Sequence, residues 1–155
     1  MKKSVRAIVT LCILLLHVTV QAQNPPRPAD IIDPPPKFDE WTKLSLADER
    51  ARLDNLAIHW QRSPRLAVYV VIYAGKKACV GEAWSRWAGV RDWLVRKRRV
   101  ASDRITWVDG GYREQPTVTI WLWPPELGKP PDAEPSVKPA EVKLVKGCKI
   151  YFGRR

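Results

Sequence analysis

The sequence has few of the residues on which enzyme active sites depend. Among 155 residues there are two histidines, three cysteines and eight glycines. We find no nucleophile elbow, no glycine-rich phosphate loop and no cluster of metal ligands. Asp109 and Glu114 flank Gly110-Gly111 and resemble the acid pair of a glycosidase, but acids at a turn account for them more simply. We therefore expect a protein that is not an enzyme and has no cofactor.

Long hydrophobic runs are also scarce, and the one that is present lies at the N-terminus. Lys2, Lys3 and Arg6 precede an apolar run from Ala7 to Val20, and a small-residue cleavage pattern follows at Ala22. This run is shorter than the roughly 20 apolar residues that cross a bilayer. It predicts a signal peptide over residues 1–22, cleaved after Ala22, and hence a periplasmic or secreted protein. No transmembrane segment is expected after its removal.

Cysteine and histidine become rarer still in the mature chain. Cys12 leaves with the signal peptide, so Cys79 and Cys148 remain. An even pair of cysteines in an oxidising compartment predicts a disulfide. His59 is the only remaining histidine, and one imidazole with two thiols makes a poor zinc site. We expect no metal.

Acidic residues are outnumbered by basic ones, 16 against 27, which gives a net charge of +11. Loss of three basic residues with the signal peptide leaves 24 against 16, or +8. This excess suggests an anionic partner such as a cell-wall polymer, lipopolysaccharide or a membrane surface. A soluble surface with excess charge explains it equally well. The tryptophans and the basic run 96–99 also suit single-stranded nucleic acid, but secretion removes that substrate, so we expect no nucleic-acid partner.

Proline-rich stretches divide the mature chain. Residues 24–36 contain six prolines, and this composition predicts an extended spacer over 23–37. A second such stretch predicts a linker over 124–140. Between them, residues 38–123 form the expected domain, and 141–155 form a C-terminal strand or tail.

Two helices are expected within the domain. Ser45 and Asp48 nearly match a capping box and predict a helix that ends near Arg62. Its apolar stripe comprises Leu46, Leu53, Leu56, Ala57 and Trp60. A second helix is expected over 81–99, with Ala83, Trp87, Val90 and Leu94 on one face.

Three strands are expected around these helices. The apolar run 66–74 predicts a central strand that is covered on both faces, and 105–109 predicts a short strand before a tight turn at Gly110-Gly111. Residues 117–123 alternate, so that Val118, Ile120 and Leu122 should face the helices and Thr117, Thr119, Trp121 and Trp123 the other side. An exposed tryptophan pair would form a stacking surface, but cover by the C-terminal tail is the simpler interpretation. With a further strand before the first helix, the order predicts an α/β (α+β) two-layer sandwich, β-α-β-α-β(-β), with two helices on one face.

Several stretches follow a recurring pattern. They are Phe38-Asp39, Leu44-Ser45, Leu53, Leu56-Ala57, the run RWAGVRDWLV over 86–95, Ala101 to Ile105, and DGGYRE over 109–114. With these stretches, residues 38–123 resemble a divergent OmpA-like C-terminal domain, the peptidoglycan-associated module of bacterial envelopes. The resemblance implies a ligand site for the diaminopimelate of the wall peptide, in which an aspartate and an arginine pair with the opposite charges of the ligand.

Of the implied aspartate and arginine, only the arginine has a counterpart in this sequence. Arg86 matches the arginine, whereas Gly75 and two lysines stand where the aspartate is expected. Glu82 is a candidate substitute one turn before Arg86, although an ordinary surface pair between these two side chains is the simpler interpretation.

The resemblance and the charge together predict a secreted, non-catalytic envelope module. Its expected ligand is peptidoglycan or another anionic envelope polymer, contacted by Arg86, Glu82 and Arg113. The alternative is a protein-interaction or scaffold domain that has lost the peptidoglycan site and binds an envelope protein.

Overall fold

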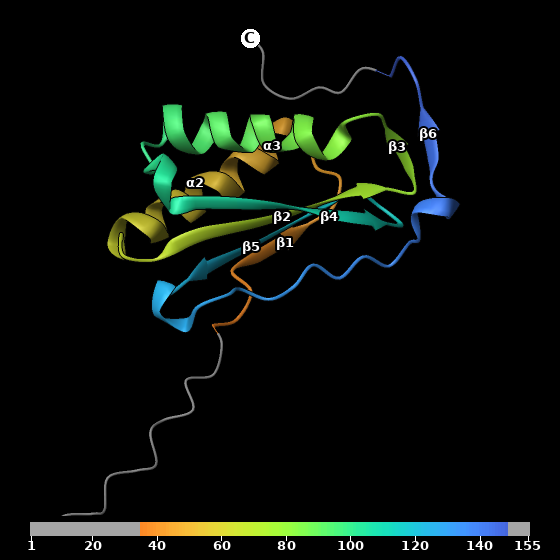
Figure 1. Ribbon diagram of the computed structural model, residues 1–155. Coiled ribbons are helices and arrows are strands. Elements are labelled where there is room, and N and C mark those ends of the chain that lie inside the picture. The colour runs from red at the N-terminus through yellow and green to blue at the C-terminus, as the bar shows by residue number, and fades with distance from the viewer. Residues whose placement is uncertain (1–34, 149–155) are drawn as a thin grey trace, which may run out of the picture. The chain divides into compact units, whose positions relative to one another are not determined.

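The computed structural model describes residues 35–148. The predicted signal peptide, most of the predicted spacer and residues 149–155 lie outside the described residues. Two helices lie on one face of a four-stranded sheet (Figure 1), which confirms the expected two-layer α/β architecture. The main elements are β1 (Asp39–Trp41), α2 (Leu46–Arg62), β2 (Ala67–Gly75), β3 (Lys77–Cys79), α3 (Glu82–Asp92), β4 (Ile105–Arg113), β5 (Thr117–Trp123) and β6 (Lys143–Val145).

The sheet has the strand order β1-β5-β2-β4. Strands β2 and β4 are parallel and are joined through α3, as a crossover connection requires. Strand β5 runs antiparallel between β1 and β2. Strand β2 is therefore central, and its residues from Val68 to Gly75 are all buried, as the apolar run predicts.

The first face of the sheet carries the main core. The Ser45 hydroxyl accepts a hydrogen bond from the Asp48 backbone N–H and caps α2, as predicted. Both predicted apolar faces pack on the sheet, except that Leu46 is 45% exposed. Helix α3 continues as a π-helical turn over Trp93–Lys97. Val118 and Ile120 belong to this core, and Leu122 packs against it.

The second face of the sheet carries an aromatic cluster. Its buried members are Tyr69, Val71, Tyr73, Trp121 and Trp123. Trp121 and Trp123 are only 9% and 5% exposed, so the idea of an exposed tryptophan stacking surface is wrong. The alternation predicted for 117–123 is confirmed, because Val118 and Ile120 belong to the first core whereas Trp121 and Trp123 belong to the second.

Residues 124–137, which we call the cover segment, lie across this aromatic cluster. Leu127 and Ala133 pack against it. The Trp123 indole N–H donates to the Gly128 carbonyl at 3.0 Å, and the Glu134 backbone N–H donates to the Tyr73 hydroxyl at 3.0 Å. Here the structure differs from the expected linker, because the proline-rich segment packs as part of the domain.

Backbone hydrogen bonds also hold the C-terminal end of the cover segment. The backbone N–H groups of Ser136 and Val137 both donate to the Tyr112 carbonyl, at 3.0 and 3.1 Å. Proline has no backbone N–H to donate to a sheet ladder. The proline-rich cover segment therefore bonds to β4 through these few backbone hydrogen bonds and does not form a further strand of the sheet.

The prediction of a tight turn at Gly110-Gly111 is wrong, because β4 continues through both glycines. The register between β2 and β4 shifts here, and Gly111 has φ of +79°, a conformation that glycine adopts readily. A Cβ atom on Gly110 would lie 2.6 Å from the Tyr73 ring. The two glycines therefore allow a bulge and a close approach inside the strand.

The C-terminal strand forms a small sheet of its own. Strand β6 pairs in parallel with β3, at one end of the main sheet (Figure 1), and we call this pair the β3–β6 ribbon. Cys79 and Cys148 are joined, which confirms the predicted disulfide. Among residues 35–148, no helix is long and apolar enough to cross a membrane.

Two tryptophans of opposite exposure test the second core. Trp123→Ala should lower the free energy of unfolding by about 3 to 5 kcal/mol, because it leaves a cavity beneath the cover segment. Trp84→Ala is the matched control, since Trp84 is 62% exposed, and should cost less than about 1 kcal/mol. Urea unfolding measures both, and equal losses would contradict a buried aromatic cluster.

The disulfide closes a long loop, with a sequence separation of 69 residues. Replacing both cysteines with serine should cost about 4 kcal/mol on the chain-entropy model. Denaturant titration of the oxidised protein and the double variant measures this difference. Two free thiols in protein purified under oxidising conditions would refute the bond.

Candidate functional site

A cavity of about 440 Å³ opens where the carboxyl ends of β2 and β4 meet the start of α3, and we call it the groove. Ligands commonly bind at this edge of an α/β sheet. The groove is lined by Ala74, Cys79, Val80, Gly81, Glu82, Ala83, Trp84, Asp109, Gly111, Tyr112 and Leu144.

The charged groups of the groove are two carboxylates. The Oε2 atom of Glu82 is buried and has no hydrogen-bond partner within the described part of the chain. Asp109 accepts a hydrogen bond from the Gly111 backbone N–H at 3.0 Å. An unpaired buried carboxylate oxygen is costly, so a donor group bound beside Glu82 would gain energy that an exposed acid does not offer.

The remaining wall is apolar and open to solvent. Val80, Trp84 and Leu144 are 61%, 62% and 57% exposed, although large apolar side chains usually pack away from water. The Trp84 ring lies 5.8 Å from that of Trp107, so a neighbouring aromatic supports it. Carboxylates beside aromatic rings suit a ligand that carries an ammonium group on an apolar stem.

Arg86 lies in the core and not among the residues that line the groove. Its side chain is 4% exposed, and its Nε donates to Glu49 at 3.2 Å. A terminal nitrogen of the same guanidinium donates to the Thr42 carbonyl at 3.1 Å. Glu49 also accepts from the Trp41 indole N–H, at 3.1 Å. These bonds join α3, α2 and β1, and the idea that Arg86 forms a surface pair with Glu82 does not fit this burial.

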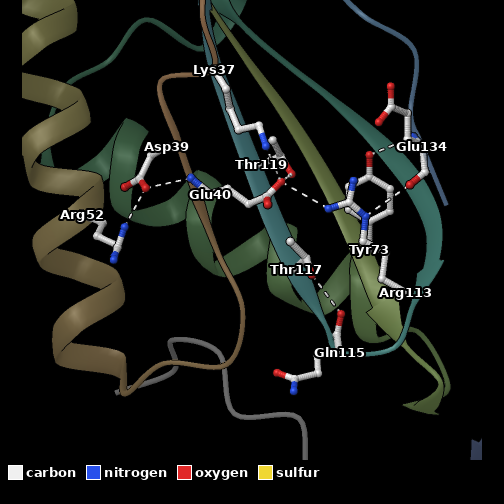
Figure 2. Close-up of polar contacts among 10 residues, drawn as sticks. All are labelled: Lys37, Asp39, Glu40, Arg52, Tyr73, Arg113, Gln115, Thr117, Thr119 and Glu134. Carbon is white, nitrogen blue, oxygen red and sulfur yellow. Dashed lines mark hydrogen bonds and ion pairs between the residues drawn. The ribbon is translucent and has the colours of Figure 1, made fainter. Parts of the chain in front are cut away.

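Arg113 lies on the second face of the sheet. Figure 2 shows its guanidinium above the Tyr73 ring, 3.8 Å from the ring centre, with bonds to Glu40 and to the Glu134 carbonyl, each at 3.2 Å. It therefore ties β4 both to β1 and to the cover segment. A direct contact between a ligand and either Arg113 or Arg86 remains a prediction.

Glu40 is the acidic centre of that network. Burial alone would raise the pKa of its carboxyl, but hydrogen bonds from Lys37, Thr119 and Arg113 outweigh it and hold the pKa below its ordinary value of 4.5. Glu40 is therefore ionised at neutral pH and engaged by its neighbours, which indicates a structural role.

The predicted site residues thus fall in three environments, and of Arg86, Glu82 and Arg113 only Glu82 lines the groove. Asp109 and Glu114, considered as an acid pair, line different cavities. Among residues 35–148, no group of three or more potential ligand residues could hold a metal ion.

Sequence reasoning did not identify Trp84, Tyr112 or Leu144 as groove residues. Trp84 carries a usable signal, because it falls one position off the buried stripe of α3 and is therefore an exposed tryptophan. Leu144 has no local signal, since the β3–β6 ribbon brings it to the groove from a distant part of the chain.

The burial of Arg86 predicts a large effect on stability. Arg86→Ala leaves Glu49 buried without its counter-charge and should cost about 3 to 5 kcal/mol. Arg96→Ala is the control, because Arg96 pairs with Asp92 while its side chain is 80% exposed, and should cost less than about 0.5 kcal/mol. Urea unfolding compares the two variants. Similar small losses would show that Arg86 is not a core residue.

Comparisons with protein families, with curated proteins and with solved structures each find no match to this chain.

Proposed function

We propose that this protein is a secreted, non-catalytic, OmpA-like envelope module that binds peptidoglycan through the groove. The observation that carries the proposal is the buried, unpaired oxygen of Glu82 in the wall of an open cavity, beside an exposed tryptophan. Wall peptides offer the matching chemistry, an ammonium group on an aliphatic stem. The carboxylate would accept hydrogen bonds from the ammonium, and Trp84 would cover the stem.

Glu82 takes the part of the aspartate that the resemblance leads us to expect. The second half of the implied pair differs, because the Arg86 guanidinium is engaged by Glu49 and Thr42. Recognition in this proposal therefore depends on the ammonium end of the ligand and not on its carboxylate. The basic surface adds an attraction to the anionic wall that salt would screen.

Co-sedimentation with purified peptidoglycan sacculi tests the proposal at low and at high salt. Glu82→Gln keeps the shape of the side chain and removes its charge, and should weaken the binding that survives high salt about tenfold, the scale of one charge-assisted hydrogen bond. Trp84→Ala should weaken it similarly. Glu126→Gln is the matched control, because Glu126 is exposed and does not line the groove, and it should bind like wild type.

Wild-type binding by both groove variants at high salt would contradict peptidoglycan recognition in the groove. Loss of all binding at high salt, in every variant alike, would reduce the wall contact to diffuse electrostatics.

The second candidate function is a protein-interaction or scaffold domain, with an envelope protein as its partner. The exposed apolar side chains at the groove and on the ribbon favour it: Val80, Trp84, Leu144 and Val145. Crosslinking in cells separates the two functions. A scaffold would lose its crosslinked partner in Trp84→Ala while the sedimentation of Glu82→Gln with sacculi stayed unchanged.

A further inference from the structure

A second cavity, of about 390 Å³, lies beside the β3–β6 ribbon and has a different charge pattern from the groove. It is lined by Gly75, Lys76, Lys77, Glu114, Pro116, Glu141 and Lys143. Three lysines and two glutamates share this wall, so the charge that remains after mutual neutralisation is positive.

Two of these lysines are register partners. Lys77 of β3 lies opposite Lys143 of β6 in the parallel ladder, where neighbouring strands are about 4.8 Å apart. Both are exposed, and neither ammonium group has a hydrogen bond or ion pair with any residue between 35 and 148. Like charges in opposed positions destabilise a strand pair. The repulsion between Lys77 and Lys143 therefore destabilises the pairing of β3 with β6.

The third lysine is already neutralised. Lys76 donates to Glu114 at 3.0 Å. This hydrogen bond raises the pKa of Lys76, and the charge of Glu141 adds to the effect. Glu114 is thereby engaged, and Glu141 is the one other carboxylate on the described wall, which it shares with Lys77 and Lys143.

The disulfide holds the two lysines together in spite of their repulsion. Strands of three residues are too short to pair stably alone. The bond between Cys79 and Cys148 fixes the end of β3 to the chain that follows β6. The backbone positions of Lys77 and Lys143 are therefore held opposite one another before any ligand arrives, and this lowers the ordering cost of binding one.

We propose that Lys77 and Lys143 together form a binding site for a phosphate group. A phosphate monoester carries about −1.5 to −2 charges at neutral pH and has three acceptor oxygens, so that one group can bridge two ammonium groups. A carboxylate carries one charge and would neutralise only one of them. This site goes beyond the proposed function, because it takes a group of opposite charge to that of the groove and does not involve Glu82.

The test is a titration of the oxidised protein with inorganic phosphate, followed by the backbone amide NMR signals of Lys77 and Lys143. Lys77→Gln and Lys143→Gln should each weaken phosphate binding about fivefold, the scale of one charge-assisted contact near the surface. Glu141→Gln should tighten it about threefold, because it removes a repelling charge. Lys138→Gln, an exposed lysine outside the cavity, is the control and should bind like wild type.

Tighter phosphate binding by Glu141→Gln is the most informative result, because lysines that acted only in folding would not produce it. Equal phosphate affinity in wild type, Lys77→Gln and Lys143→Gln would overturn the site. That result would leave sedimentation with sacculi untouched, so failure here and failure of the groove are distinguishable.

A second arm separates the sources of the phosphate group. Vesicles of phosphatidylcholine with and without phosphatidic acid are sedimented with wild type and Lys77→Gln at high salt. Binding to the phosphatidic acid vesicles that falls in Lys77→Gln assigns the site to a lipid headgroup. Binding to soluble phosphate alone excludes a lipid headgroup and assigns the site to a soluble phosphate group.

Discussion

The structure depends on covering both faces of β2. Every residue of this strand from Val68 to Gly75 is buried, and a sheet with an apolar strand at its centre cannot leave either face in water. Within residues 35–148 the helices α2 and α3 both lie on one face (Figure 1). The second face is closed by the cover segment, whose leucine and alanine pack on a cluster of tyrosine and tryptophan. Folding therefore requires chain beyond the last strand of the main sheet.

This requirement also creates both proposed sites. Because the cover segment crosses the sheet and ends beside Tyr112, the chain that follows it reaches β3 and pairs there as β6. One side of the β3–β6 ribbon adds Leu144 to the wall of the groove. Lys143, one residue earlier, lines the phosphate cavity with Lys77. An acidic, aromatic cavity and a basic one thus lie at the same end of the domain, and the disulfide stabilises the strand pair that separates their linings.

Local patterns in the sequence were sufficient to predict the two-layer architecture. The Ser45 cap, the apolar run of β2 and the alternation of β5 each depend on neighbouring residues, and each is observed. The misplaced features depend on distant partners. The partner of Arg86 is Glu49, 37 residues away, and no periodicity reports such a pair. A proline-rich composition predicts an extended chain correctly, but it does not show which surface that chain covers.

Native-state hydrogen exchange at the backbone amides of Glu134 and Val137 tests the central claim most directly. These amides donate to the Tyr73 hydroxyl and to the Tyr112 carbonyl. If the cover segment is part of the cooperative domain, both amides will be protected nearly as strongly as those of β2. Exchange at the rate of an unstructured peptide, beside a protected β2, would show that residues 124–137 are a linker and would contradict the account.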